Sequence, residues 1–240
     1  MSLRYPTGTL ALDSVSFQAR PGELTVILGQ NGSGKSTLVR CIVRLLRPTT
    51  GAIRVAGDDL VPLSGRRLRT ARQQIAVIFQ DASLVPRRTA LANVAVGCLG
   101  RQRQPWTWIG GLPADERRGA FQQLERVGMS PLWEQRSDTL SGGQAQRVAI
   151  ARALHQAPAV LLADEPVASL DPDATHEVMS LLQRLAREEG IVVVCVLHQL
   201  EVAREFADHL VGLRGGKVVI DQPAFQVTTE DLSSLYRAGA

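Results

Sequence analysis

The chain has 240 residues, of which 45% are hydrophobic and 21% are charged, and its formal net charge is +4. This length is enough for one large domain with a buried core, with or without an inserted subdomain. The longest apolar run, 191–197, is too short to span a bilayer, and the N-terminus lacks the apolar segment and cleavage site of a secretory signal, so we expect the chain to remain in the cytoplasm.

The arginines are spread along the whole chain, and only 4% of the residues are aromatic. We therefore expect no nucleic-acid surface of the kind that combines a basic groove with stacking aromatics. The three cysteines, Cys41, Cys98 and Cys195, are scattered and odd in number. This predicts reduced, packed thiols rather than disulfides or a metal site.

Short β-branched segments alternate with segments of helical periodicity, which predicts an α/β domain with a mainly parallel sheet. The predicted buried strands cover 24–28, 75–79, 160–163 and 191–197. The predicted helices cover 35–46, ended by Arg47-Pro48, and 173–189, closed by Gly190. The segments 209–213 and 217–221 flank Arg214-Gly215-Gly216 and predict an antiparallel hairpin.

Residues 86–157 differ from the rest because helical patterns follow one another there without a strand. The expected helices cover 89–99, 114–127 and 145–156. We therefore predict one domain over 1–240, in which residues 1–85 and 158–240 form the α/β core and residues 86–157 form an inserted helical subdomain. A loop at 101–112 carries Trp106 and Trp108, for which we favour packing within the subdomain over contact with a partner.

A nine-residue run after the strand 24–28 matches the phosphate-binding pattern G-x-x-x-x-G-K-[ST]. Its residues are Gly29, Gln30, Asn31, Gly32, Ser33, Gly34, Lys35, Ser36 and Thr37. The glycines let the backbone turn its N–H groups inward, and the following helix adds the positive end of its dipole. In this pattern Lys35 reaches the β- and γ-phosphates of a nucleotide and the Ser36 hydroxyl lies on Mg²⁺. The sequence thus predicts binding of ATP and Mg²⁺.

Two further motifs carry polar groups at the ends of regular elements. The strand 160–163 runs into Asp164-Glu165-Pro166, and strand alternation predicts that the two carboxylates point in opposite directions, one toward Mg²⁺ and one toward the attacking water. The second motif offers N–H groups and a hydroxyl at the start of the helix 145–156, which makes a second anion site. It consists of Leu140, Ser141, Gly142, Gly143 and Gln144.

Together these motifs resemble those of the ATP-binding subunits of ABC transporters, over nearly the whole chain. Residues 29–37 resemble the Walker A motif, 140–144 the signature motif and 161–165 the Walker B motif. Ser169-Leu170-Asp171 resembles the D-loop, Gln80 the Q-loop and His198 the switch histidine. The resemblance implies a P-loop NTPase fold of the RecA-like class. It also implies a homodimer formed on ATP binding, in which the signature helix of one subunit meets the γ-phosphate held by Walker A of the other.

The resemblance also implies roles for single residues. Glu165 would be the general base or water-positioning group, Asp164 and Gln80 would serve Mg²⁺, and His198 would contact the γ-phosphate. Tyr5 lies where the family places an aromatic residue that stacks on adenine, although only residues 1–4 precede it here, where the family has a full strand.

Longer strings resemble the ATP-binding subunit of phosphonate importers. They cover 126–129, 163–172 and 197–199, together with the tryptophan-containing loop after 93–97. This resemblance implies an ATPase at the cytoplasmic face of the inner membrane, integral-membrane permease subunits as partners, and indirectly a periplasmic solute-binding protein.

Other classes of ABC ATPase share some of these motifs. Importers of phosphite or another small oxyanion or solute share them, as do exporters and lipid-extraction ATPases. Soluble DNA-repair ATPases of the family would need long coiled-coil heptads in the insertion, which are absent here. Translation-linked members usually carry two ATPase halves in one chain, whereas this chain has one.

Overall fold

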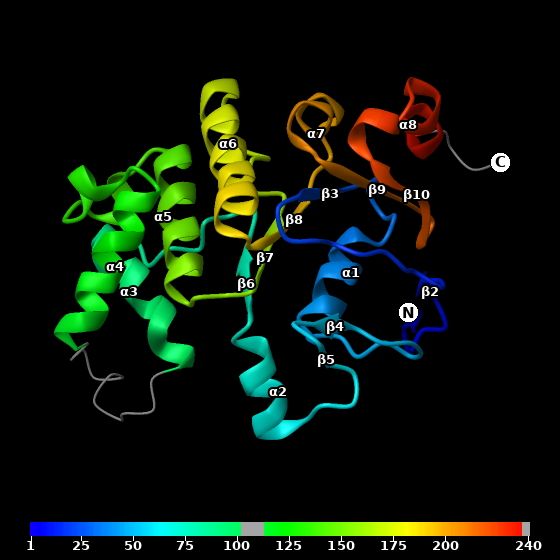
Figure 1. The fold of residues 1–240 in the computed structure, drawn as a ribbon, viewed down its shortest axis with the longest axis horizontal. Helices are drawn as coiled ribbons and strands as arrows, with labels where there is room; N and C mark the ends of the chain where they lie inside the picture. The colour runs from blue at the N-terminus through cyan, green and yellow to red at the C-terminus, as the bar shows by residue number, and fades with distance from the viewer. Residues whose placement is uncertain (102–112, 237–240) are drawn as a thin grey trace.

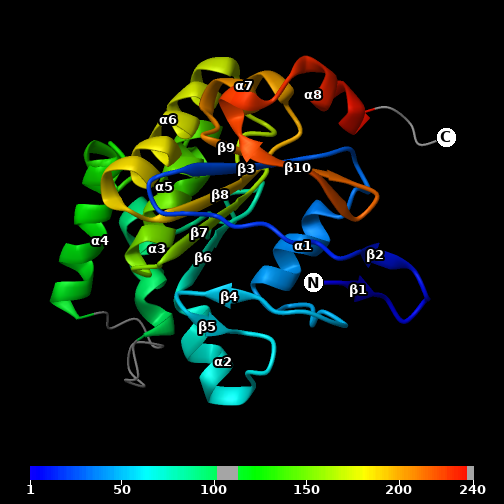
Figure 2. The ribbon, with the colours of Figure 1, turned by 45° about the vertical axis from the view of Figure 1, so that its right-hand side comes forward.

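The computed structural model describes residues 1–101 and 113–236, and its centre is a six-stranded sheet (Figures 1 and 2). The strands lie in the order β10-β9-β3-β8-β7-β6. They are β3 Leu24–Leu28, β6 Ile75–Ile78, β7 Val160–Asp164, β8 Val192–Val196, β9 His209–Arg214 and β10 Lys217–Pro223. All neighbouring pairs are parallel except β9 and β10, which form an antiparallel hairpin. The predicted α/β fold with a mainly parallel sheet and antiparallel elements is therefore confirmed.

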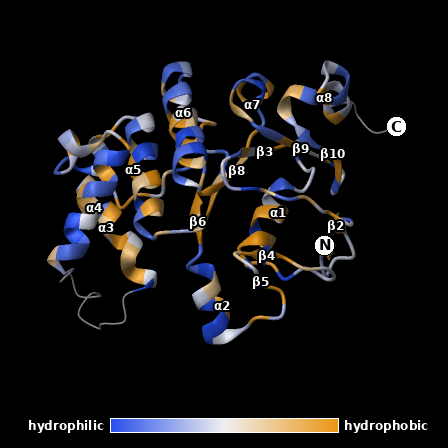
Figure 3. Ribbon diagram, viewed as in Figure 1, coloured by the Kyte–Doolittle hydropathy of each residue, from blue (hydrophilic) through white to orange (hydrophobic). Residues whose placement is uncertain are grey.

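Helices cover both faces of this sheet, as parallel strands require. One face packs against α1, Lys35–Ile42, and against the small sheet of β1, Leu3–Arg4, and β2, Leu10–Leu12. The other face packs against α6, Pro172–Glu189, α7, Leu200–Phe206, and α8, Thr229–Tyr236. Because both faces are covered, β3 is buried along its whole length and the core strands are apolar (Figure 3).

A helical region lies beside the edge strand β6, away from the hairpin (Figure 1). It contains α3, Ala90–Ala95, the 3₁₀ helix η1, Val96–Gly100, α4, Ala114–Arg126, and α5, Gly142–His155. Two short 3₁₀ helices, η3 Ser130–Leu132 and η4 Ser137–Thr139, connect α4 to α5. The predicted division into a core and an insertion over residues 86–157 stays a prediction. Trp106 and Trp108 lie outside the described residues.

The helix α5 attaches the helical region to the sheet through side chains that reach backbone carbonyls. Gln156 donates to the Ile75 carbonyl at 2.8 Å, at the start of β6. Arg152 donates to the Ala82 and Ser83 carbonyls at 2.9 and 2.7 Å, in the segment that leaves β6. These bonds hold both ends of β6 to one helix, so a displacement of α5 is transmitted to the segment after β6.

Several predicted boundaries were wrong, each for a local reason. The first helix ends at Ile42 rather than at residue 46, since Arg44 has φ of 57° and its guanidinium donates to the Leu60 carbonyl. The predicted helix 89–99 divides into α3 and η1. The helix predicted from 145 begins at Gly142, because Ser141 and Gln144 form a capping box.

Some elements were not predicted from the sequence at all. They include β2, η3, η4, α7 and α8, the hairpin of β4, Arg54–Val55, and β5, Asp58–Asp59, with α2, Gly65–Arg72, and η5, Ala224–Gln226. All three cysteines are buried and free. Within the described residues, no helix is both long and apolar enough to cross a membrane.

Candidate functional site

The loop between β3 and α1 is built around Lys35. The Lys35 ammonium is buried and donates to the carbonyls of Gly29 and Gln30, at 2.7 and 3.1 Å. Gly34 has φ of 106°, a left-handed conformation that suits glycine, and a side chain there would collide with the Ala11 carbonyl. The turn of the β9–β10 hairpin braces the loop, since the Gly216 N–H donates to the Ser33 carbonyl at 2.9 Å.

This loop has the properties of an anion site. The first turn of α1 carries no acidic residue, and its N-cap, Gly34, has no side chain that could accept the N–H groups of that turn. The hydroxyl oxygen of Ser33 is buried and has no hydrogen-bond partner among the residues that the structure describes. Unpaired donors and a buried ammonium at a helix N-terminus fit a phosphate group.

Two carboxylates face this loop from the end of β7. Asp164 is the last residue of the strand, and Glu165 adopts a left-handed backbone conformation with φ of 52°. The Glu165 N–H still donates to the Val196 carbonyl at 3.0 Å, which fixes the turn against β8. The sequence predicted that strand alternation points the Asp164 and Glu165 side chains in opposite directions. This reason is wrong for Glu165, because its backbone is no longer extended and the turn sets the direction of its side chain. A strained non-glycine residue at a strand end is typical of functional sites.

His198 approaches Glu165 from the end of the neighbouring strand β8. Its Nδ1 lies 3.7 Å from Glu165 Oε2, and its side chain is 44% exposed. The Tyr236 hydroxyl in α8 donates to the His198 carbonyl at 3.3 Å, which holds the backbone of this segment from the opposite side. The sheet thus places an acid and an imidazole, predicted separately from the sequence, next to each other.

The electrostatics of Lys35 and Asp164 are linked. Burial lowers the pKa of Lys35, whereas the nearby Glu165 and Asp164 raise it. Burial raises the pKa of Asp164, and the charge of Glu165 adds to this effect, while Arg40 and Lys35 oppose it. Burial therefore disfavours the charged form of both groups. Ionisable groups with shifted pKa values are common in sites that bind charged ligands.

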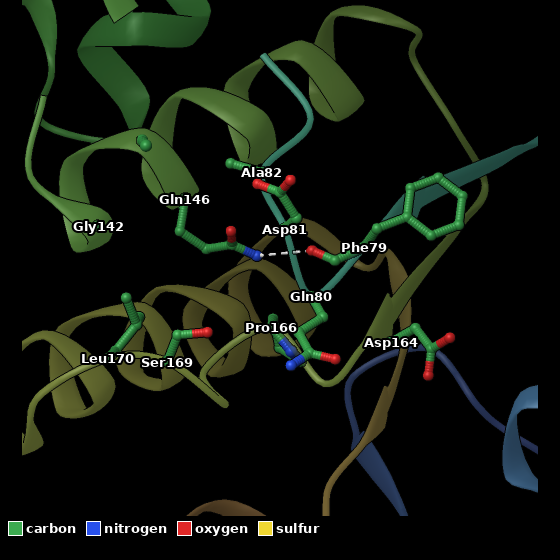
Figure 4. Close-up of a pocket in the computed structure, with 11 residues that line it drawn as sticks. Phe79, Gln80, Asp81, Ala82, Gly142, Gln146, Asp164, Pro166, Ser169 and Leu170 are labelled. Atoms are coloured by element: carbon green, nitrogen blue, oxygen red, sulfur yellow. Dashed lines mark hydrogen bonds between the residues drawn. The ribbon is translucent and has the colours of Figure 1, made fainter. Parts of the chain in front are cut away.

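Gln80 lies beside Asp164 at a cavity of about 450 Å³ between the sheet and the helical region (Figure 4). The cavity is lined from one side by Gln80 and Asp164 and from the other by Gly142 and Leu170. Gln146 of α5 donates to the carbonyl of Phe79 at 3.3 Å, directly before Gln80. The position of Gln80 is therefore set by the same helix that carries the 140–144 motif.

The 140–144 motif begins α5 as a capping box. Ser141 Oγ accepts from the Gln144 N–H at 3.3 Å, and Gln144 Oε1 accepts from the Ser141 N–H at 3.0 Å. Gly142 and Gly143 lie between them in the first turn, where backbone N–H groups have no partner within the helix. Ser141 is exposed, so this helix start faces outward as a second anion-type surface.

Tyr5 follows the short strand β1 and touches the phosphate-loop helix. Its hydroxyl lies 3.1 Å from Thr37 Oγ1, and the side chain is half-buried. Ser36, the predicted metal ligand, and Asn31 are exposed at the loop, while Gly32 has φ of 80° within it. All residues predicted in this loop therefore belong to one structural unit.

Some residues that organise the site were not predicted from the sequence. Gln146 is buried, and Arg152 donates to carbonyls of the segment that follows Gln80. In the sequence, only their polar character on an otherwise apolar helix face could have indicated a role. Asp171 in the D-loop-like motif accepts from the Ala174 N–H at 2.8 Å and so caps α6. The contact of Tyr236 could not be predicted from the sequence, because its partner is a backbone carbonyl.

Comparison with known proteins places this arrangement in a family. The family model described as "ABC transporter" matches residues 12–168. The chain is 33% identical to a solved dimeric post-hydrolysis state of the ATP-binding cassette MJ0796 bound to ADP and Pi, with a TM-score of 0.79, and the match covers 93% of this chain and 96% of that one. It is 26% identical to the ADP conformation of MJ1267, an ATP-binding cassette of an ABC transporter, with a TM-score of 0.85 and coverage of 98% of each chain. The fold and site therefore define an ABC-type P-loop cassette.

Among curated relatives, a protein of Synechococcus sp. (strain JA-2-3B'a(2-13)) named "Phosphonates import ATP-binding protein PhnC 2" is 45% identical over 98% of this chain and 88% of its own length. The "Phosphate-import ATP-binding protein PhnC" of Mycolicibacterium smegmatis (strain ATCC 700084 / mc(2)155) is 48% identical over 95% of this chain and 87% of its own length. The chain belongs to the ABC transporter family of ATP-binding proteins.

The raised pKa of Asp164 makes a prediction about stability without nucleotide. Because folding raises this pKa, the contribution of Asp164 to stability is fully present below its unfolded pKa and is lost as the pH rises through its folded pKa. The Asp164→Asn variant has no carboxyl group to ionise at this position, so its stability should not decrease in this way as the pH rises. We expect the variant to melt at a higher temperature than the wild type at about pH 7.5, and the difference to shrink near about pH 4, close to the ordinary aspartate pKa.

Thermal melting followed by circular dichroism across this pH range measures the difference. Asp58→Asn, which changes an exposed carboxylate in β5, serves as the control and should leave the pH profile unchanged. A melting temperature of Asp164→Asn at or below that of the wild type at about pH 7.5 would contradict this reading of the burial of Asp164.

Proposed function

We propose that this chain is the ATP-binding and ATP-hydrolysing subunit that energises an ABC importer, with phosphonates as the solute class. The observation that carries the ATPase assignment is the convergence at one sheet edge of a buried lysine in a phosphate-type loop with Asp164, Glu165 and His198. The names of the relatives at 45% and 48% identity support import and narrow the solute to a phosphonate or phosphate.

In this proposal the loop residues bind the phosphates of ATP. The backbone N–H groups around Gly32 and Gly34 face the phosphates, Lys35 exchanges its two carbonyl partners for phosphate oxygens, and Tyr5 stacks on the adenine. The loop consists of Gly29, Gln30, Asn31, Gly32, Ser33, Gly34, Lys35, Ser36 and Thr37.

The metal-binding residues of the proposal are Ser36, Gln80 and Asp164, an oxygen-donor set of the kind that suits Mg²⁺. When bound, Mg²⁺ neutralises charge on the phosphates. Asp164 then gains from Mg²⁺ a positive charge that opposes the effect of burial on its pKa and favours its ionised form. Glu165 positions the attacking water and accepts its proton, and His198, at 3.7 Å, lies close enough to hold the Glu165 carboxylate and to donate toward the transferred phosphate.

Two phosphate-type helix starts in one chain support a composite site. The start of α1 lies on the core side of β6 and the start of α5 on the helical side, in both views of the fold (Figures 1 and 2). In a head-to-tail dimer, Ser141, Gly142, Gly143 and Gln144 of one copy meet the γ-phosphate held by the other. The solved dimers of the cassette MJ0796, one of them with ADP and Pi, support this assembly.

The partners of the dimer follow from the import assignment. Integral-membrane permease subunits supply the path for the solute, and a periplasmic solute-binding protein delivers it. The chain therefore works at the cytoplasmic face of the inner membrane. Within residues 86–157, the proposed helical insertion, α5 is tied to the Q-loop segment by Gln146 and Arg152, so nucleotide-dependent movement of Gln80 can reach the surface that contacts a permease.

Replacing the proposed base tests the hydrolytic site. Glu165→Gln keeps the shape of the side chain but removes its ability to accept a proton, so we expect steady-state ATP hydrolysis to fall about 10² to 10⁴-fold. Nucleotide binding should persist, since Lys35 and its loop are intact, and the variant should accumulate as an ATP-bound dimer. Phosphate release and size-exclusion chromatography measure the two effects.

The matched control is Glu188→Gln, the same change on the exposed surface of α6, which should leave turnover unchanged. Turnover of Glu165→Gln within about tenfold of the wild type would refute the role of Glu165, because a general base contributes more than this.

Uptake by the assembled transporter tests the solute class. We expect vesicles that contain the permease and this chain, supplied with the solute-binding protein, to accumulate a labelled alkylphosphonate when ATP is present on the side of this chain. Accumulation should stop with Glu165→Gln. Uptake of inorganic phosphate with no uptake of alkylphosphonate would assign the phosphate alternative, and ATP-dependent release of solute would exclude import.

A further inference from the structure

The helical region contains a second cluster of reactive side chains, separate from the nucleotide site. Cys98 of η1, Glu116 of α4 and His155, the last residue of α5, offer one ligand atom each, and these atoms all lie within 4.8 Å of one another. Among the described residues, this is the one such group of three. Cys98 is fully buried, His155 is 4% exposed, and the side chain of Glu116 is 16% exposed.

Two glycines allow the three elements to meet at His155. A side chain at Gly97 would lie 2.3 Å from the Arg152 carbonyl and 3.2 Å from His155 Cβ, so η1 can approach α5 only with glycine there. A side chain at Gly119 would lie 3.1 Å from His155 Cε1, a tight contact, so glycine there favours the close approach of α4. The backbone thus brings one thiol and one carboxylate against one imidazole.

The imidazole of His155 and the carboxylate of Glu116 lie close together, and the imidazole nitrogen is buried. His155 Nε2 lies 3.1 Å from Glu116 Oε2, yet Nε2 is a buried atom with no hydrogen-bond partner in the described part of the chain. A buried imidazole nitrogen this close to a carboxylate oxygen is also the arrangement of two ligands of one ion, whose lone pairs point at a shared centre. Two ligands on a tetrahedral Zn²⁺ lie about 3.4 Å apart, given bond lengths of about 2.0 to 2.3 Å.

From this geometry we propose that Cys98, Glu116 and His155 form a binding site for Zn²⁺ or a similar late divalent transition metal. A thiolate, an imidazole and a carboxylate are a donor set that zinc accepts, with one position left for water. The site lies in the helical region and takes no part in ATP chemistry. Bound metal would link η1, α4 and α5 and so stabilise that region by mass action.

Arg101, which pairs with Glu116, must move before a metal can bind. Arg101 Nη2 lies 3.0 Å from Glu116 Oε2, and its side chain is 37% exposed, so the guanidinium can turn toward solvent. A cavity of about 240 Å³, lined in part by Arg101, Glu116 and His155, lies directly beside the ligands and gives room for the ion and its water. Asp115, whose side chain is 91% exposed, also lines this cavity and adds negative charge near its opening.

Metal binding at this site requires the Cys98 thiol to lose its proton. Burial and the charge of Glu116 raise the pKa of Cys98 to about 11, so the thiol is protonated in the free chain and must release one proton to solvent as the metal–sulfur bond forms. His155 binds as neutral imidazole, since burial and then Arg101 lower its pKa. The sequence predicted that all three cysteines are packed thiols without a metal. The proposed site changes this expectation for Cys98 and leaves it for Cys41 and Cys195.

Metal titration of the full-length chain tests the proposal. The tag-free protein is stripped with a chelator, kept free of nucleotide, and titrated with Zn²⁺ and with Co²⁺, whose thiolate charge-transfer absorption reports sulfur ligation. We expect one metal per chain by native mass spectrometry and a thiolate–Co²⁺ band. Cys98→Ser should abolish the band, and His155→Asn and Glu116→Gln should each weaken binding by at least about tenfold, as loss of ligating or orienting groups does.

Three control variants separate this site from other sources of binding. His176→Asn removes an exposed histidine that lies 3.4 Å from Glu205, and Cys41→Ser removes another buried thiol. Asp164→Asn alters the proposed nucleotide–metal site. All three should show the same thiolate–Co²⁺ band as the wild type, since none of them changes Cys98, Glu116 or His155. Metal should raise the melting temperature of the wild type more than that of Cys98→Ser.

Circular dichroism of each variant verifies that it is folded, and binding is scored only on folded variants. If Cys98→Ser does not fold, His155→Asn and Glu116→Gln decide the outcome. Binding below one metal per chain, or a Co²⁺ spectrum that is unchanged when Cys98, Glu116 and His155 are replaced, would overturn the proposal. The cluster would then be a packed group of polar side chains only.

Discussion

The whole site depends on the parallel alignment of β3, β7 and β8. Parallel neighbours end at the same edge of a sheet, so the phosphate loop after β3, the acids after β7 and the histidine after β8 must come together. The register pairs Ile27 with Val196 and Asp164 with Val196. Residues distant in sequence therefore meet at one edge, and no loop needs to be long.

The same alignment explains the charge distribution at this edge. A buried ammonium and two acids are brought near one another, and burial disfavours the charged forms of both Lys35 and Asp164. The Lys35 ammonium donates to two backbone carbonyls, which partly offset the cost of its burial. In the proposed function a nucleotide with its metal ion supplies the missing charges, so binding and ionisation of this edge are coupled.

The helical region is connected to this edge by few but directional bonds. Gln146 and Arg152 of α5 reach carbonyls after β6, and the C-cap residue Gln156 reaches carbonyls at and before the start of β6. The 140–144 motif starts the same helix. A movement of Gln80 is therefore transmitted to α5 by hydrogen bonds rather than by a flexible linker. This gives a physical element that nucleotide can bias, which any account of coupling to a membrane partner requires.

The sequence was most informative where one local rule decides the structure. The apolar run 24–28 predicted β3 without error, since all of its residues are buried, and Gly190 ended α6 as predicted because it adopts a left-handed conformation. Prediction was weaker where tertiary contacts decide. The kink at Arg44 follows from its bond to the Leu60 carbonyl, and the turn at Glu165 follows from its bond to Val196, and neither leaves a local pattern.

The site residues followed from motifs, but their organisation did not. Gln146, Arg152 and Tyr236 act through backbone carbonyls, and a carbonyl is present at every residue, so the sequence carries no mark of the partner. The proximity of Cys98 to His155 depends on glycine at position 97, where a side chain would collide with the Arg152 carbonyl. Contacts of this kind become visible only when the backbone is in place.

The central claim is that each complete site is shared by two copies, since the phosphate loop and the 140–144 motif lie on opposite sides of β6 (Figure 1). The most direct test mixes Ser141→Arg protein with Lys35→Ala protein. Each variant alone should be inactive, because every site in its homodimer carries one lesion. A mixed dimer gathers both lesions in one site and leaves the other intact, so we predict that ATPase activity returns on mixing. No return of activity in proven mixed dimers would contradict the account.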